Sequence, residues 1–164
     1  HSTIILNNTN ITEIKDNSSK KILPKNVIFE KSEHKEKTIM DGSHNGYFNN
    51  YQKICKRKII IWKNKNLIEG EDSIIASSTS LSKIVYHIRF HLMPGVTATV
   101  TKNKKNVIIK TKKNNLWSFE TSREVVIENS VFVENDIAIE TAQLVISGVT
   151  TNLKNIIKWS LKKN

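Results

Sequence analysis

The stretch that decides the fold is Lys83-Ile-Val-Tyr-His-Ile-Arg-Phe-His-Leu-Met-Pro-Gly95. Its side chains alternate between an apolar face (Ile84, Tyr86, Ile88, Phe90 and Leu92) and a mixed face (Val85, His87, Arg89 and His91). A period of two held over nine residues is typical of a β-strand with one buried face. Pro94-Gly95 ends the strand, because proline cannot donate to a sheet and glycine accepts turn dihedrals. The pattern predicts a strand whose apolar face belongs to the core.

The rest of the chain repeats this pattern in shorter segments separated by turns every eight to twelve residues. Val27–Glu30 and Lys37–Met40 read as a hairpin, and Asn103–Lys105 reads as a tight turn between two further strands. Asp41–Tyr47 is rich in turn residues, and the serine-rich segment 73–82 reads as a loop. No segment shows an apolar stripe with a period of 3.6 residues. This organisation predicts an all-β fold, a multi-stranded antiparallel β-sandwich.

Length and charge limit the possible partners. The 164 residues fit one domain, and the formal net charge of +11 would suit a polyanion. The 26 basic residues are 23 Lys and 3 Arg, spread along the whole chain, whereas specific nucleic-acid recognition favours arginine forks. We therefore expect no specific nucleic-acid partner, and an acidic polysaccharide fits the positive field equally well.

Cysteine content and hydropathy exclude two further classes. Cys55 is the single cysteine, so the chain forms no internal disulfide and no cysteine-rich zinc site. No run of residues approaches the ~18 apolar residues of a membrane-spanning helix, so we expect no transmembrane segment.

The residues with catalytic chemistry form no complete set in the sequence. His87 and His91 lie four residues apart on one strand, hence about 13 Å apart at ~3.3 Å per residue, which is too far to ligate one ion directly. Glu69, Glu71 and Asp72 are clustered, but adjacent side chains of a strand diverge. Nucleotide-binding and nucleophile-elbow motifs are absent from the sequence.

Four segments resemble one family in their order and spacing. They are His1-Ser2-Thr3 with Asn8-Thr9-Asn10, Ser43-His44-Asn45-Gly46-Tyr47, Leu67-Ile68-Glu69-Gly70-Glu71-Asp72, and Ile88-Arg89-Phe90-His91-Leu92-Met93-Pro94-Gly95. Supporting matches are Trp117-Ser118-Phe119, Glu128-Asn129-Ser130-Val131 and Ile157-Lys158-Trp159. Together they resemble the C-terminal part of heparinase II/III-like proteins, polysaccharide lyases of a type common in alphaproteobacteria. One departure is Asn45, where the resemblance leads us to expect aspartate.

The resemblance implies that residues 1–164 are a single β-sandwich domain, the C-terminal portion of a longer lyase with an N-terminal α/α toroid. Such lyases cleave uronic-acid-containing polysaccharides, glycosaminoglycans among them, by β-elimination. The family resemblance also implies a periplasmic or cell-envelope location. The reactive tyrosine and most of the machinery lie on the toroid or upstream of this segment in the family. We therefore expect this domain to line the cleft and to be inactive by itself.

The resemblance also suggests site residues. His44, Tyr47 and Arg57 are the expected substrate-binding residues on the cleft side, although Tyr47 and Arg57 also suit a half-buried aromatic and a surface charge. His1 matches a histidine that looks like one ligand of a structural zinc ion in the family. Its partner ligands would precede residue 1, and structural zinc needs about four ligands. Zinc is thus expected in the full-length protein and only weakly, or not at all, on this fragment.

A second function remains open at the sequence level, namely a free-standing carbohydrate-binding or other polyanion-binding sandwich. The two readings differ in their surfaces. A free-standing module predicts closed sheet edges, whereas a piece of a lyase predicts an opening strand that lacks neighbours and leaves apolar surface uncovered.

Overall fold

The computed structural model describes residues 2–11, 13–14, 21–22, 24, 26–77 and 82–164. Within these ranges the chain forms strands and one short helix. In chain order the elements are β1 (Ile4–Leu6), β2 (Glu13–Ile14), β3 (Lys21–Ile22), β4 (Val27–Glu33), β5 (Lys37–His44), α1 (Phe48–Tyr51), β6 (Lys53–Trp62), β7 (Leu67–Ala76), β8 (Val85–His91), β9 (Thr97–Val100), β10 (Asn106–Lys110), β11 (Leu116–Thr121), β12 (Val125–Glu134), β13 (Ile137–Val149) and β14 (Lys154–Lys163).

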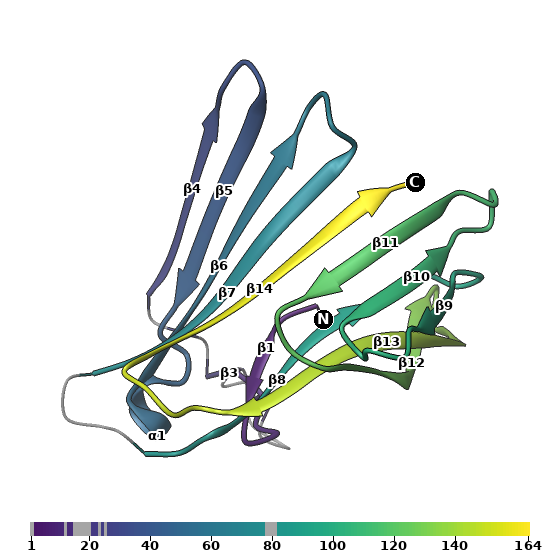
Figure 1. The fold of residues 1–164 in the computed structure, drawn as a ribbon. Coiled ribbons are helices and arrows are strands. Elements are labelled where there is room, and N and C mark those ends of the chain that lie inside the picture. The colour runs from purple at the N-terminus through teal and green to yellow at the C-terminus, as the bar shows by residue number, and fades with distance from the viewer. Residues whose placement is uncertain (1, 12, 15–20, 23, 25, 78–81) are drawn as a thin grey trace.

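Two antiparallel sheets form the two layers of a sandwich (Figure 1). The smaller sheet has the strand order β1-β8-β13-β12, and the larger has the order β4-β5-β6-β7-β14-β11-β10-β9. β2 and β3 pair with each other in a separate two-stranded ribbon. The antiparallel β-sandwich expected from the sequence is confirmed.

The core lies under β8, the strand formed by the opening stretch. β8 pairs with β1 on one side and β13 on the other. Ile88 is 0% exposed and Tyr86 3%. The Phe90 ring lies 5.1 Å from the ring of Phe119 and 4.9 Å from that of Trp159, both on the larger sheet. The apolar face that alternation predicts is therefore the face that joins the two sheets.

The other face of β8 is polar, and its two histidines contact different partners. Nδ1 of His87 lies 2.8 Å from the Ser147 hydroxyl on β13, and Nδ1 of His91 lies 2.7 Å from the Ser130 hydroxyl on β12. Each imidazole thus has a hydroxyl partner of its own. The two rings do not converge on a common site.

Two segments continue as strand where the sequence suggested turns or a loop. Residues 41–44 belong to β5, because β4 and β6 pair with it on both sides up to His44. Residues 73–76 belong to β7, where Ile74 is fully buried, so the loop expectation was wrong there. The helix α1 has four residues, too few for an apolar stripe, and it ends at Gln52 in the left-handed conformation (φ 53°).

We expect Gly70→Ala to destabilise the fold. Gly70 lies opposite Trp159 in the β7–β14 register, and a Cβ at this position would lie 2.1 Å from atoms of the indole ring. The resulting displacement of a core aromatic should lower the free energy of unfolding by about 1–3 kcal/mol. Urea denaturation measures it. Gly42→Ala is the matched control, since its Cβ would meet neighbours only at ordinary contact distance of 3.8 Å, and equal losses in both variants would contradict the explanation.

Candidate functional site

His44 ends β5 where the chain enters the loop before α1. A pocket of about 310 Å³, hereafter the His44 pocket, opens beside it. Its walls are formed by Asn26, Ile28, Ser43, His44, Asn45, Phe48 and Ile54. Apolar walls combined with a few polar groups are typical of small-molecule sites. Four segments build the pocket: the start of β4, the end of β5 with the loop after it, the start of α1 and the start of β6.

The loop fixes the orientation and protonation of His44. The Gly46 N–H donates a hydrogen bond of 3.3 Å to Nδ1 of His44. Burial lowers the pKa of His44 below its ordinary value of 6.5. The imidazole is therefore neutral at pH 7 and carries its proton on Nε2, because Nδ1 accepts. In this state His44 can donate a hydrogen bond but contributes no positive charge.

Tyr47 holds the loop in place from inside. It is 1% exposed, and its hydroxyl donates to the main-chain oxygen of Thr9 at 2.9 Å and lies 3.5 Å from that of Ile4. Burial raises the pKa of Tyr47 to about 12. The phenol therefore keeps its proton at neutral pH, and its ring lies 5.9 Å from that of His44. The structure places Tyr47 behind His44, as a support for the loop.

Three of the five N–H donors of Arg57 are bound by groups of this domain. Its guanidinium donates to both carboxylate oxygens of Asp72, at 2.6 and 3.0 Å, and to the main-chain oxygen of Ser2 at 2.8 Å. It also lies 5.1 Å from the centre of the Phe90 ring and 5.8 Å from that of Trp159. The Arg57 guanidinium thus connects β6 with β7, with β8 and with the segment before β1.

Asp72 is the centre of this network, which the sequence reading missed. Its side chain is 0% exposed, and the Trp159 indole N–H donates to it at 2.9 Å in addition to the two bonds from Arg57. One signal could have found the ion pair: a hairpin turn at residues 63–66 places residue 57 opposite residue 72. The Trp159 contact spans 87 residues and has no local signal.

A smaller hollow of about 100 Å³ brings His44 and Arg57 to one place. It lies between Ser2–Ile4 and the inner side of β5 and β6. His44 therefore lines two hollows, and Tyr47 lines neither of them. Of the three residues expected to bind substrate, only His44 both lines a hollow and can donate a side-chain hydrogen bond to a ligand without giving up a bond within the domain.

The expected zinc ligand, His1, lies outside the described residues. Among the residues that the structure does describe, no three His, Cys, Asp or Glu side chains are placed to hold a metal ion. These residues by themselves do not fit a structural zinc site, which needs about four ligands. Zinc binding through His1 stays a prediction.

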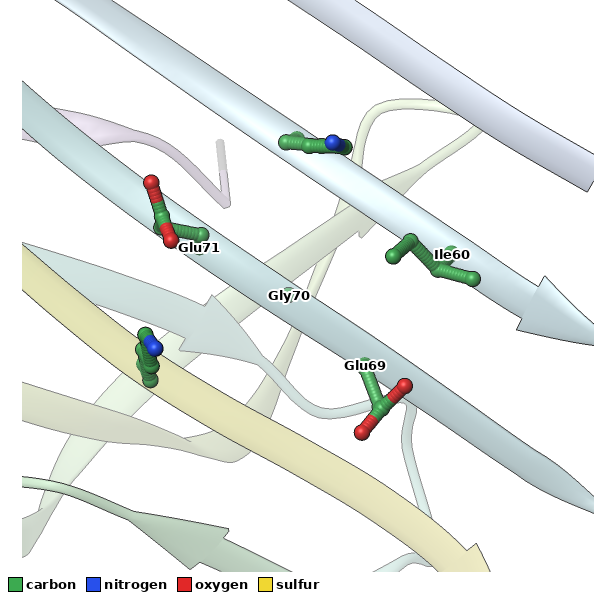
Figure 2. A pocket seen from close by; sticks show the side chains of 6 residues that line it. Ile60, Glu69, Gly70 and Glu71 are labelled. Atoms are coloured by element: carbon green, nitrogen blue, oxygen red, sulfur yellow. The ribbon is translucent and has the colours of Figure 1, made fainter. Parts of the chain in front are cut away.

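A third hollow, of about 210 Å³, lies on the outer face of the larger sheet (Figure 2). Figure 2 shows Glu69 and Glu71 on the same face of β7, with Gly70 between them. In the sheet register Glu71 lies between Lys58 and Lys158, so opposite charges alternate across the hollow. Because each carboxylate has basic or indole neighbours on an open sheet surface, we assign this hollow no role in a reaction.

The comparisons with known proteins agree with this architecture. The family model described as "Heparinase II/III-like, C-terminal" matches residues 1–160. The chain belongs to the heparinase II/III-like C-terminal family. A comparison with curated protein sequences gave no match.

Solved structures show the same fold for this heparinase-like domain. A heparan sulfate lyase HepC mutant from Pedobacter heparinus matches with a TM-score of 0.74 and 11% identity, over 99% of this chain and 24% of that one. A heparinase III described as the BT4657 gene product matches with a TM-score of 0.75 and 8% identity, over 100% and 23%. A further heparinase III matches with a TM-score of 0.73 and 13% identity, over 99% and 23%. The chain thus spans about a quarter of the length of these proteins.

None of the helices in the described part of the heparinase-like domain is long and apolar enough to cross a membrane.

We expect Arg57→Met to be among the most destabilising single changes in the heparinase-like domain. The substitution leaves the Asp72 carboxylate buried without its ionic partner, which costs about 3–5 kcal/mol. The double variant Arg57→Met/Asp72→Leu should recover most of this loss, because it removes both charges. Arg89→Met is the matched control: its partner Glu128 is 43% exposed, and such pairs contribute about 0–1 kcal/mol. Similar losses for both arginines in urea unfolding would contradict this assignment.

We expect stability to fall as the pH drops below 6.5. Burial lowers the pKa of folded His44, and it also lowers that of His91. Below pH 6.5 the unfolded chain therefore binds more protons at these histidines than the folded chain does. The contribution of the neutral histidines to the free energy of unfolding is complete above the histidine pKa of the unfolded chain, and it is lost as the pH falls towards the lower pKa of the folded chain. His44→Gln should reduce the slope of unfolding free energy against pH between about 5 and 7, and adding His91→Gln should reduce it further. An unchanged slope in the double variant would contradict the prediction.

Proposed function

We propose that this domain is the C-terminal β-sandwich of a polysaccharide lyase that cleaves uronic-acid-containing polysaccharides by β-elimination, and that it forms one wall of the substrate cleft. The observation that carries the proposal is the family match over residues 1–160 combined with a share of only 23–24% of the matched lyase chains. The remainder of the parent polypeptide, an N-terminal α/α toroid in this proposal, supplies the reacting groups.

The side chains of the site support a division of labour. β-Elimination requires a base that removes the C5 proton, a group that neutralises the carboxylate, and an acid that assists the leaving oxygen. Tyr47 is buried and keeps its proton, and Arg57 is bound to Asp72. Neither is therefore available as the base or as the partner of a substrate carboxylate. The proposal therefore does not assign Tyr47 or Arg57 a catalytic role.

His44 is the residue through which the domain contacts substrate in this proposal. The neutral imidazole donates from Nε2 to a sugar hydroxyl or carboxylate oxygen. His44 pairs with Val27 and Cys55, so its imidazole is directed to the inner side of the larger sheet, towards the smaller hollow. Ile28 and Ile54 are on the opposite side of these strands and give the His44 pocket an apolar wall, with Asn45 at its rim. The Oδ1 atom of Asn45 accepts the main-chain N–H of Asn26 at 3.0 Å, so this amide also closes the pocket between β4 and the loop.

The charge of the chain supports an acidic polymer as substrate. A formal net charge of +11 raises the local concentration of a polyanion and accelerates its association, more so at low salt. A periplasmic or cell-envelope location, where polysaccharide is accessible, belongs to the same proposal. The proposal includes a bound zinc ion only in the longer polypeptide, where His1 would be one of its ligands.

We expect His44→Ala in the parent lyase to raise KM for the polysaccharide and to leave kcat nearly unchanged. Loss of one hydrogen bond of about 0.5–1.5 kcal/mol corresponds to a decrease in kcat/KM of roughly 2- to 13-fold. Formation of the unsaturated uronate product measures it. His87→Ala is the control, because His87 lies on the outer face of the smaller sheet and contacts Ser147.

Two results would contradict the proposal. Formation of unsaturated product by residues 1–164 alone would show that the domain carries the reacting groups itself. A parent polypeptide that binds acidic polysaccharide and forms no unsaturated product would favour a carbohydrate-binding module instead.

A further inference from the structure

β4 is a sheet edge with an unusual amount of exposed apolar surface. It is the terminal strand of the larger sheet, and all seven of its residues are exposed. Three consecutive apolar side chains carry most of this surface, with Val27 66%, Ile28 59% and Phe29 64% exposed. A long apolar edge strand is a template for pairing with another strand, and folded proteins usually protect such edges.

The register identifies the main-chain groups that point away from the sheet. The Asn45 N–H donates to the main-chain oxygen of Asn26, and the His34 N–H donates to that of Lys37. Because bonded pairs alternate in antiparallel sheets, the even-numbered residues of β4 bond to β5. The odd-numbered residues, beginning with Val27 and Phe29, therefore direct their N–H and C=O groups to the other side. In the described part of the chain no strand pairs with that side.

The side chains of Val27 and Phe29 face the space between the two layers. Phe29 lies in register with Gly42, and Gly42 with Arg57, whose guanidinium faces Phe90 of the smaller sheet. The smaller sheet ends at β1, and Ile4 of β1 lines the smaller hollow together with Gly42 and Arg57. The β4–β5 hairpin therefore projects beyond the smaller sheet, as Figure 1 shows. In the described part of the chain, Figure 1 shows no strand of the smaller sheet over this hairpin, so this flank of the sandwich has a single layer.

We propose that an extended segment of the same parent polypeptide, outside residues 1–164, pairs along the free edge of β4 and places apolar side chains against Val27 and Phe29. This inference rests on the proposed function, which makes the domain a quarter of a longer lyase. The matched lyases carry about three quarters of their length outside the region similar to this chain. A segment of the same polypeptide reaches the edge at high effective concentration, and strand addition uses main-chain bonds for affinity and alternate side chains for selectivity.

Hydrogen exchange in two proteins tests the proposal directly: the 164-residue chain and the parent lyase. The N–H groups of Val27 and Phe29 should exchange rapidly in the 164-residue chain. In the parent lyase they should exchange at least about a hundredfold more slowly, because they donate to the added strand. Equal rates in the two proteins would overturn the proposal.

Proline variants separate edge pairing from stability of the domain. Phe29→Pro removes an N–H that faces the free edge and no bond to β5, so it should leave the melting temperature of the 164-residue chain nearly unchanged and lower that of the parent lyase. Phe29→Thr keeps the main-chain donor and should have a smaller effect on the parent. Ile28→Pro is the control, since it removes a bond to β5 and should destabilise both proteins. A parent lyase insensitive to Phe29→Pro would overturn the proposal.

The remaining outcomes distinguish this inference from the proposed function. A parent that forms unsaturated product and responds to His44→Ala, yet leaves the β4 edge exposed, would overturn the edge pairing alone. Protection of the edge in a parent without lyase activity would overturn the function and support the pairing. Protection in the 164-residue chain together with sedimentation as a dimer would show that a second copy occupies the edge, which also overturns the proposal.

Discussion

The structure depends on the compensation of one buried charge. Asp72 is an acidic side chain that pairs with Arg57 and has no exposed surface, and a carboxylate without partners in a protein interior costs several kcal/mol. Arg57 and Trp159 together donate three hydrogen bonds to it. These donors come from β6 and β14, the two neighbours of β7, so the pairing registers of three adjacent strands are linked. A slip of one residue in either the β6–β7 or the β7–β14 pairing would turn a partner to the opposite face of the sheet.

The same network positions the candidate site. Arg57 binds the main-chain oxygen of Ser2, which holds the segment before β1 against the inner side of the larger sheet. The Tyr47 hydroxyl donates to the main-chain oxygen of Thr9, just after the turn that follows β1, and supports the loop that carries His44. Two groups thus orient the His44 imidazole: the buried Tyr47 ring beside it, and the Gly46 N–H of its own loop, which donates to Nδ1. A pocket on a loop gains its rigidity from core contacts of this kind.

Period-two alternation predicted the sandwich and the inward face of β8, because burial of one face imposes that pattern directly on the chain. Resemblance of ordered motifs led to the family. Local composition failed at residues 73–76, where serine next to buried Ile74 is tolerated in a central strand paired on both sides. The role of Arg57 was open because a sequence shows charge but not partners. Only the long-range contact with Trp159 makes Asp72 the centre of a core network.

The bonding of the charged groups in this domain fits the supporting role that we propose for it. A group that reacts with substrate must be exposed and free to change its bonding during the reaction, whereas Arg57, Asp72 and Tyr47 are held in the bonds that keep the sheets together. Releasing any of them for chemistry would cost stability of the fold. A neutral donor such as His44 carries no such conflict, because its Nδ1 bond to Gly46 orients the ring and leaves the Nε2 proton for a ligand. In the function proposed above, the constraint that stabilises the sandwich confines the contribution of this domain to recognition.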